Sequence, residues 1–341
     1  MVVTITPVKV SRLAAAVAAA ALVLFGGGPQ ANAATRVAVA GGVLTLDGRP
    51  WWPSGFDAYE LGTDWAVNRG CGAQVDLNRY FASLPPDSVT RFDAFAALAR
   101  NKRTGAVDFG PLDAVFAAAE RHGQLLVAVL ASGEGACEDG EFKDAQWYTG
   151  GWTGDYAQWL AAAVGRWGRS PALAGWELVG EPEPRQQQSC PADAAAVLRG
   201  FFDQAGARLR ALDPDTPIWS GVAGGSQCGI DGDGYLTVGQ SPYIDVLDLH
   251  DYGAADVDLR LRQAASLGKP LVVAELGRFA GSCGSLPDRA AAIAARVSAQ
   301  RQAGSAGVLF WNFVPDPRVG DCTMDIGPND PLFDVLRSLN R

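Results

Sequence analysis

The sequence lacks the short motifs that mark several large enzyme classes. It has no C-x-x-C pair, no H-E-x-x-H segment, no G-x-S-x-G turn and no phosphate-binding glycine loop. Its two histidines, His122 and His250, are far apart in a chain of 341 residues, so a zinc site is not expected. These absences argue against a metalloprotease, an α/β-type serine hydrolase and a nucleotide-binding enzyme. We therefore predict neither a metal nor a cofactor.

Long apolar runs are scarce as well. An uncharged apolar stretch, Leu13–Phe25, follows two basic residues and precedes Ala31–Asn32–Ala33. This order is typical of a secretory signal peptide, and the stretch is shorter than the about 20 residues that a membrane span needs. We expect residues 1–33 to be removed and residues 34–341 to be secreted, with no membrane span.

Positive charge is limited too. The chain has 28 basic and 37 acidic residues, and loss of two basic residues with the signal peptide changes the net charge from −9 to −11. An acidic protein repels nucleic acid and anionic membranes, so a neutral or cationic partner is favoured. No Pro/Ser-rich linker, charge block or low-complexity tract interrupts the 308 mature residues. We expect them to form one domain and to act as a monomer.

Apolar runs of strand length alternate with amphipathic stretches through most of the chain. The eight predicted strands are Trp52–Gly55, Val89–Phe92, Leu125–Leu130, Gly175–Val179, Ile218–Val222, Val246–Leu249, Leu271–Ala274 and Val308–Trp311. Eight such repeats predict a closed (β/α)8 barrel of the TIM type. An open doubly wound sheet also alternates, but it normally has fewer strands and often a glycine-rich first turn, which is absent here.

Helices are predicted between these strands, and a short hairpin before them. The expected helices are Val75–Leu84, Leu112–His122, Tyr156–Trp167, Ala192–Leu212, a weak one near Tyr235–Gly239, Leu259–Leu267, Arg289–Gln302 and Pro331–Leu339. The hairpin is expected over Val37–Leu46, with Asp47–Gly48 as a turn signal.

Six cysteines in an exported chain predict disulfides. Each lies after a predicted strand and before or at the start of the next helix, on the face of a barrel where active sites lie. From the proximity of neighbouring loops we predict the pairs Cys71–Cys137, Cys190–Cys228 and Cys283–Cys322.

Two carboxylates stand at the ends of buried strands. Glu181 follows the run that begins at Gly175, and Glu275 ends the run that begins at Pro270. Such a position fixes a side chain at the rim of the sheet while its charge escapes the core. Glycoside hydrolysis needs two carboxyl groups of this kind, one to protonate the leaving oxygen and one to meet the positive charge of the sugar.

These residues also carry a resemblance. The segment Trp176–Pro182 resembles the W-E-L-x-N-E-P motif of retaining clan A glycoside hydrolases, especially family 5, the cellulase and β-mannanase family. Further matches follow in barrel order: Leu46–Pro50 with Gly55–Phe56, Thr90–Phe92, Asp248–Tyr252, Ala274–Gly277 and Phe310–Asn312. Together they cover most of the mature chain. The resemblance implies a retaining glycosidase that cleaves O-glycosidic bonds of a polysaccharide or glycoside by double displacement.

The resemblance also implies roles for single residues. Glu181 is expected to be the acid/base and Glu275 the nucleophile, with Arg91 holding Glu275 ionised and Tyr252 donating a hydrogen bond to it. His250 is expected to orient a sugar hydroxyl or Glu181. Trp311 is expected to form the floor on which the reacting sugar stacks. Trp147, in the loop after the third strand, is either a sugar-binding aromatic or a packing residue.

The chain departs from the family pattern at two positions. Gly180 stands where the family has an asparagine that binds the 2-hydroxyl of the sugar, and Ala131–Ser132 stands where the family has a polar sugar-binding residue. Either the substrate differs in shape, or activity is weakened. The alternatives are an exo-acting furanosidase on a cell-wall glycan and a catalytically weakened sugar-binding barrel.

Overall fold

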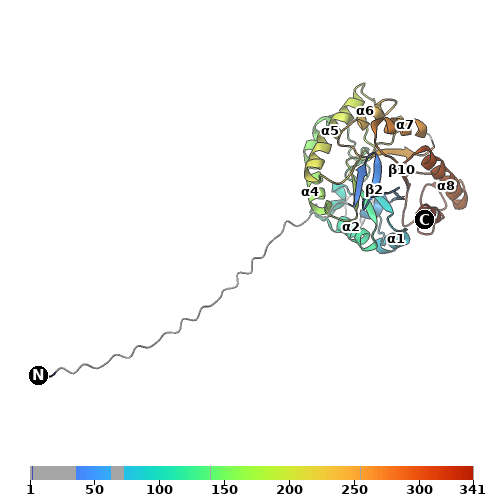
Figure 1. Ribbon diagram of the computed structural model, residues 1–341, viewed down its shortest axis with the longest axis horizontal. Helices are drawn as coiled ribbons and strands as arrows, with labels where there is room; N and C mark the ends of the chain where they lie inside the picture. Colours follow the sequence, from blue (N-terminus) through green and yellow to red (C-terminus); the bar gives the residue numbers. More distant parts are fainter. Residues whose placement is uncertain (1, 3–35, 63–72, 139, 254, 341) are drawn as a thin grey trace. The chain divides into compact units, whose positions relative to one another are not determined.

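The computed structural model describes residues 2, 36–62, 73–138, 140–253 and 255–340. Eight parallel strands form one sheet: β4 Ser54–Asp57, β5 Val89–Asp93, β6 Leu125–Val129, β7 Leu173–Glu177, β8 Ile218–Trp219, β9 Leu247–Asp251, β10 Leu271–Leu276 and β12 Gly307–Phe310. Their order is β8-β7-β6-β5-β4-β12-β10-β9, and a parallel bridge between Trp219 and Val246 joins the two edges. The predicted (β/α)8 barrel is confirmed (Figure 1).

Helices follow the strands around the outside of the barrel (Figure 1). They are α1 Leu77–Ser83, α2 Gly110–His122, α3 Ala145–Thr149, α4 Asp155–Trp167, α5 Ala194–Leu212, α6 Gly234–Gly239, α7 Val257–Leu267, α8 Leu286–Ala303 and α9 Leu332–Leu339. All except α3 were predicted, although their ends differ by a few residues. Short 3-10 turns lie at Tyr59–Gly62, Ala96–Ala99 and Gly151–Thr153.

Two strands differ from prediction for backbone reasons. β4 begins after Pro53, because proline has no N–H to donate to a neighbouring strand. β8 stops at Trp219, and Gly221 close behind it adopts a φ of +65°, which breaks the extended conformation. Both shifts leave the carboxyl ends of the strands on the same face.

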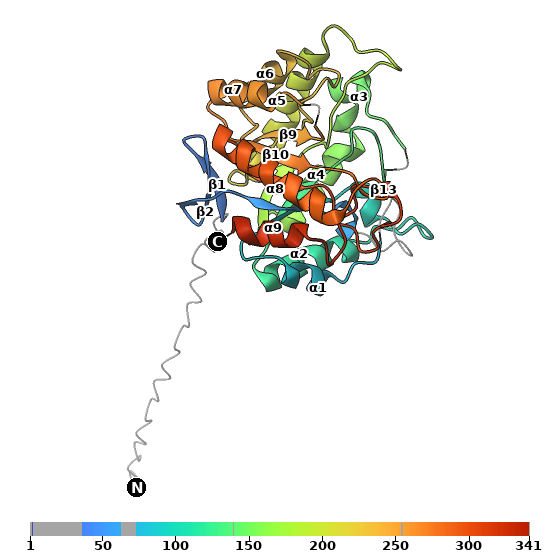
Figure 2. The same cartoon turned by 90° about the vertical axis from the view of Figure 1, so that its right-hand side faces the viewer.

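The chain before the barrel forms a three-stranded antiparallel sheet rather than a plain hairpin. Its strands are β1 Val37–Ala40, β2 Val43–Leu46 and β3 Arg49–Pro50. The tight turn between β1 and β2 is at Gly41–Gly42, both with positive φ, and Asp47–Gly48 turns the chain from β2 to β3. Val37, Leu44 and Leu46 pack with apolar side chains from inside the barrel. Figure 2 shows β1 and β2 at one end of the barrel and β13 Cys322–Thr323 at the other.

Two predicted disulfides are present on the loops that follow the strands. Cys190 bonds to Cys228 and Cys283 to Cys322. Cys71 lies outside the described residues, so the Cys71–Cys137 pair stays a prediction, as does the signal peptide of residues 1–33. Among the described residues, no helix is long and apolar enough to cross a membrane.

Candidate active site

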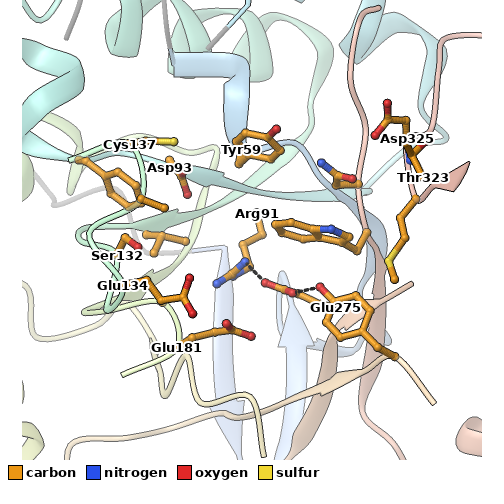
Figure 3. Close-up of a pocket in the computed structure, with 18 of the residues that line it drawn as sticks. Tyr59, Arg91, Asp93, Ser132, Glu134, Cys137, Glu181, Glu275, Thr323 and Asp325 are labelled. Carbon is orange, nitrogen blue, oxygen red and sulfur yellow. Dashed lines mark hydrogen bonds and ion pairs between the residues drawn. The ribbon is translucent and has the colours of Figure 1, made fainter. Parts of the chain in front are cut away.

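The carboxyl ends of the barrel strands surround a cavity of about 780 Å³. Its lining includes five residues that the sequence analysis assigned to the site: Arg91, Glu181, Tyr252, Glu275 and Trp311. Figure 3 shows Glu181 and Glu275 on one side of the cavity, below Tyr59. The barrel therefore brings residues from five different strands and loops to one place.

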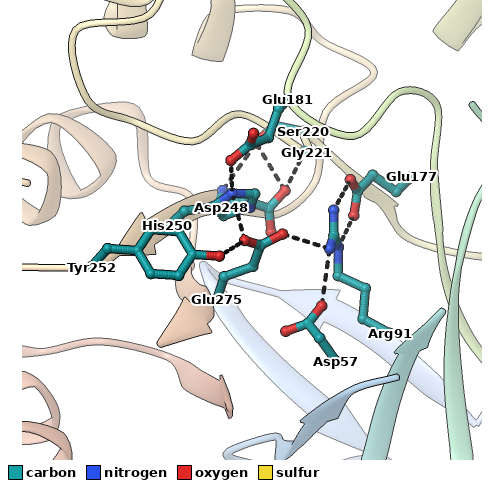
Figure 4. Close-up of polar contacts among 10 residues, drawn as sticks. All are labelled: Asp57, Arg91, Glu177, Glu181, Ser220, Gly221, Asp248, His250, Tyr252 and Glu275. Atoms are coloured by element: carbon teal, nitrogen blue, oxygen red, sulfur yellow. Dashed lines mark hydrogen bonds and ion pairs between the residues drawn. The ribbon is translucent and has the colours of Figure 1, made fainter. Parts of the chain in front are cut away.

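Glu275 lies inside β10 and is almost fully buried, with 4% of its surface exposed. Arg91 donates to its Oε1 atom at 2.8 Å, and the Tyr252 hydroxyl donates to Oε2. The His250 Nδ1 atom lies 3.3 Å from Oε2. Burial raises the pKa of Glu275, and the positive charges of His250 and Arg91 oppose that rise. The carboxylate is thus fixed by neighbours on both of its oxygen atoms (Figure 4).

Arg91, on β5, is the hub of a buried ion-pair network. Its Nε and Nη2 atoms bind Glu177 at 2.7 Å each, and Nη1 binds Asp57 at 2.9 Å as well as Glu275. One guanidinium therefore serves three carboxylates, and all four side chains are buried. Asp57 and Glu177 were not predicted from the sequence as partners of Arg91. An acidic residue inside a strand buried on both faces, such as Glu177, was the available signal, because a buried charge needs a partner.

Glu181 is held mainly through its backbone. It lies four residues beyond the end of β7 and has a φ of +51°, an uncommon conformation for a residue with a side chain. Its N–H donates to the Gly221 carbonyl at 2.8 Å, and the neighbouring Gly180 N–H donates to Ala131 at 2.8 Å. Asp248, fully buried on β9, accepts hydrogen bonds from the Gly221 N–H and the Ser220 hydroxyl. Sequence reasoning missed Asp248 as well.

The loop after β6 supports the Glu181 segment from one side. The Gly133 N–H donates to the Gly180 carbonyl at 2.8 Å, and a Cβ added at Gly133 would lie 2.3 Å from the Glu181 carbonyl oxygen. Glu138 accepts from the Ser132 N–H at 2.6 Å and from the Lys143 ammonium at 2.7 Å. The ammonium also binds the Ser132 carbonyl at 2.7 Å. This ion pair holds the loop where it meets the backbone of Glu181.

His250 connects the two glutamates. Its Nδ1 atom is 2.6 Å from Glu181 Oε1, closer than to Glu275. Burial disfavours the imidazolium, but Glu275 and the Glu181 hydrogen bond outweigh it and raise the His250 pKa to about 9. Burial of Glu181 opposes its ionisation, yet His250 outweighs this and lowers the Glu181 pKa. In the empty site at neutral pH, the shared proton therefore resides on His250.

The two glutamates are close together. One oxygen atom of each carboxylate and one ring nitrogen of His250 all lie within 4.8 Å of one another. The donor types of this trio also suit a metal ion, but each is already engaged in hydrogen bonds or ion pairs with the others, Arg91 or Tyr252. The arrangement is better suited to moving protons than to binding a metal.

The predicted aromatic residues are divided between the cavity and the core. Trp311 lines the cavity and stacks on Tyr59, with ring centroids 5.8 Å apart and planes at 14°. Trp147 lies on α3, half-buried, and packs against Tyr148, Tyr156 and Phe201, and it is not among the residues that line the cavity. Of the two readings of Trp147, its position favours packing.

Comparisons with known proteins place this fold. No family model matches the chain. A probable mannan endo-1,4-beta-mannosidase F from Neosartorya fischeri is 28% identical over 240 residues, which cover 62% of this chain and 50% of that protein. The chain thus spans half the length of this curated relative. An endo-1,4-beta-mannanase from Rhizomucor miehei superposes with a TM-score of 0.68 at 15% identity, covering 90% of this chain and 98% of the other.

A glycoside hydrolase family 5 mannosidase from Rhizomucor miehei superposes with a TM-score of 0.64 at 13% identity, covering 91% of this chain and 97% of that one. The fold is that of glycoside hydrolase family 5. The sequence resembles the same family, as its motifs indicated. In the family 5 fold, as in other TIM barrels, the cavity at the carboxyl ends of the strands is the expected place for the active site.

Proposed function

We propose that this chain is a retaining glycoside hydrolase, with Glu275 as nucleophile and Glu181 as acid/base. The observation that carries the proposal is the pair of carboxylates, with oxygen atoms within 4.8 Å of each other, at the carboxyl ends of two barrel strands. Retaining enzymes have carboxyl groups about 5–5.5 Å apart, whereas inverting enzymes leave about 6.5–9.5 Å for a water molecule. The close pair favours double displacement.

The first step forms a bond between a Glu275 oxygen and the anomeric carbon, while the bond to the leaving oxygen breaks. Glu181 gives its proton to that oxygen, and the leaving alcohol departs. Arg91 and Tyr252 hold Glu275 in line and stabilise its negative charge before attack. In the second step Glu181 takes a proton from water, the oxygen of which attacks the same carbon and releases Glu275.

His250 supplies the proton that Glu181 needs for the first step. In the empty site the proton is on His250, 2.6 Å from Glu181 Oε1. The Glu181 side chain is 36% exposed, so a sugar in the cavity would remove it from water. Loss of water raises the pKa of a carboxyl group and favours transfer of the proton from His250 to Glu181.

We propose a β-linked mannan as the first substrate class to test, because the relatives named above act on mannan or mannosides. The Gly180 departure keeps furanosides in the panel, since the cavity has no amide at that position. The signal peptide predicted for residues 1–33 supports secretion as part of the same proposal.

Replacement of each glutamate by alanine tests the roles. Glu275→Ala should abolish turnover, because no glycosyl-enzyme can form. Glu181→Ala should lose about 10²–10⁴-fold on substrates with poor leaving groups and much less on nitrophenyl glycosides. Azide should then restore turnover of Glu181→Ala with retention of the anomeric configuration, and turnover of Glu275→Ala with inversion of that configuration.

Glu141→Ala is the control, because Glu141 is exposed and does not line the cavity. Equal activity of all three variants and the wild type would refute the proposal. A wild-type chain that binds manno-oligosaccharides but turns over none of the panel would indicate a sugar-binding barrel.

A further inference from the structure

An exposed phenyl ring lies at the rim of the catalytic cavity and has no part in the chemistry proposed above. Phe279 is 55% exposed and lies four residues after Glu275 in the chain. Both residues line the same cavity. Among the large apolar side chains that are exposed in the described part of the chain, Phe279 and Tyr252 line this cavity. Tyr252 is already bound to Glu275. Phe279 therefore needs another explanation.

The backbone around Phe279 is anchored although its ring is exposed. Residues Ala280–Gly281 form β11, which pairs antiparallel with β13, and the disulfide Cys283–Cys322 joins the two strands' segments. The strands approach closely, because a Cβ added at Gly281 would lie 2.1 Å from the Asp321 carbonyl oxygen. An exposed ring on a fixed backbone loses little further freedom when a ligand binds.

The register of this ribbon places an apolar residue opposite Phe279. Ala280 pairs with Thr323, so continuing the register places Phe279 opposite Met324, which also lines the cavity. Polar side chains also line the cavity, and Asp93, Ser132 and Glu134 lie across it from Thr323 and Asp325 (Figure 3). A sugar presents an apolar C–H face and polar hydroxyl edges, so a cavity that combines an exposed phenyl ring with polar side chains can contact both kinds of surface.

We propose that Phe279, with Met324 opposite, is a stacking platform for a sugar ring of the substrate outside the ring that Glu275 attacks. The occupant is a further pyranose unit of the β-linked glycan, because the platform is continuous with the cavity that holds the catalytic pair. The platform gives affinity for chains of several sugars and contributes little to a single sugar. The inference rests on the proposed function.

The test compares substrates with and without further sugar rings. For Phe279→Ala, KM for mannopentaose should rise about 3–10-fold, because one stacking contact with the substrate is lost. With β-mannosyl fluoride, which carries one sugar and no aglycone ring, kcat/KM should stay unchanged. Phe279→Trp should keep the wild-type KM for mannopentaose.

Phe142→Ala is the matched control, because Phe142 is 41% exposed and does not line the cavity. The double variant Cys283→Ser/Cys322→Ser should reproduce the rise in KM for mannopentaose, since the ribbon then loses its covalent link. The platform is refuted if Phe279→Ala matches wild type on mannopentaose or loses equally on both substrates.

A separate binding measurement keeps the two proposals apart. Titration of mannopentaose into Glu275→Gln by calorimetry should give a Kd that the added Phe279→Ala change weakens by the same factor. If wild type has no hydrolytic activity but this difference in binding remains, the catalytic proposal fails and the platform stands. If mannopentaose binds equally with and without the ring, the platform fails whatever the activity.

Discussion

The two glutamates that we propose as the catalytic pair are held in different ways. Glu275 lies within a regular strand, is 4% exposed and is bound by a cation, a hydroxyl and an imidazole. Glu181 lies four residues past its strand, its side chain is 36% exposed, and within the described part of the chain its side chain is hydrogen-bonded to His250. Strand geometry and buried charge fix the first. Loop backbone contacts fix the second.

The difference matches the two proposed tasks. A nucleophile attacks one carbon from one direction, so it benefits from a rigid strand and a fixed charged partner. An acid/base must change its protonation state twice in a cycle and must meet both the leaving oxygen and water. A partly exposed side chain with one titratable partner can do this, whereas a carboxylate locked to arginine cannot. Each of the following experiments changes the contacts of one glutamate and leaves those of the other in place.

The largest effect is expected at the Glu275 side, from Arg91→Met. The change leaves Asp57, Glu177 and Glu275 buried without their shared cation, which costs about 3–5 kcal/mol of the free energy of unfolding. Activity should be lost with it, because Glu275 without Arg91 takes up a proton. Denaturant unfolding and hydrolysis rates measure the two effects.

The control for Arg91→Met is Arg166→Met. Arg166 also pairs with an aspartate, Asp113, but at the surface, where such pairs contribute about 0–1 kcal/mol. If both variants unfold at the same denaturant concentration, the network around Arg91 does not stabilise the fold as described.

The Arg91 network also shows where sequence reasoning reached its limit. Local sequence patterns predicted the barrel and the ends of its strands. The order of the motifs pointed to four residues of the site: Arg91, His250, Tyr252 and Glu275. The partners Asp57 and Glu177 depend on which strands are neighbours, and the resemblance carried no role for either. Glu177 lies within the predicted strand Gly175–Val179 and was given no role, although a carboxylate in a doubly buried strand requires charged or hydrogen-bonding partners.

The supports of Glu181 were harder to foresee. Gly133 contacts the backbone of Glu181, about 48 positions later in the chain, because of the conformation of two loops. Neither segment contains a sequence motif that predicts this contact. The same holds for Trp147, because its packing depends on Phe201 from a distant helix. Local sequence patterns located the candidate residues themselves, but not the contacts between distant segments that hold them in place.

The next largest effect is expected at the Glu181 side, from Gly133→Ala. The new Cβ would lie 2.3 Å from the Glu181 carbonyl oxygen, so the backbone of the proposed acid/base must move. A displacement of about 1 Å can lower kcat by about 10²-fold. The loss should be larger for alkyl glycosides, which need protonation, than for nitrophenyl glycosides, which do not.

Gly150→Ala controls for the added methyl group, since nothing lies within 4 Å of a Cβ at that position. If Gly133→Ala loses the same factor on alkyl and nitrophenyl glycosides, the loop does not act through the acid/base. Full wild-type activity would show that the Glu181 backbone is not set by this contact.

The smallest effect is expected from pH, through His250. Its pKa is raised to about 9 in the fold, so its contribution to stability is complete below about pH 6.5 and is lost as pH rises through about 9. Lys269, whose pKa burial lowers to about 8, titrates in the same range with the opposite sign. Lys269 is present in both wild type and His250→Gln, so its contribution cancels in the difference between their Tm values. This difference in Tm should become smaller between pH 7 and pH 10.

The same titration should appear in the kinetics. Above about pH 9 His250 has no proton to pass to Glu181, so kcat/KM for alkyl glycosides should fall while nitrophenyl glycosides are affected less. Glu275 cannot produce this split between substrates, because it attacks both kinds in the same way. Parallel pH profiles for the two substrates in wild type would therefore show that His250 serves Glu275 rather than Glu181. His250 would then belong with Arg91 and Tyr252 as a partner of the proposed nucleophile.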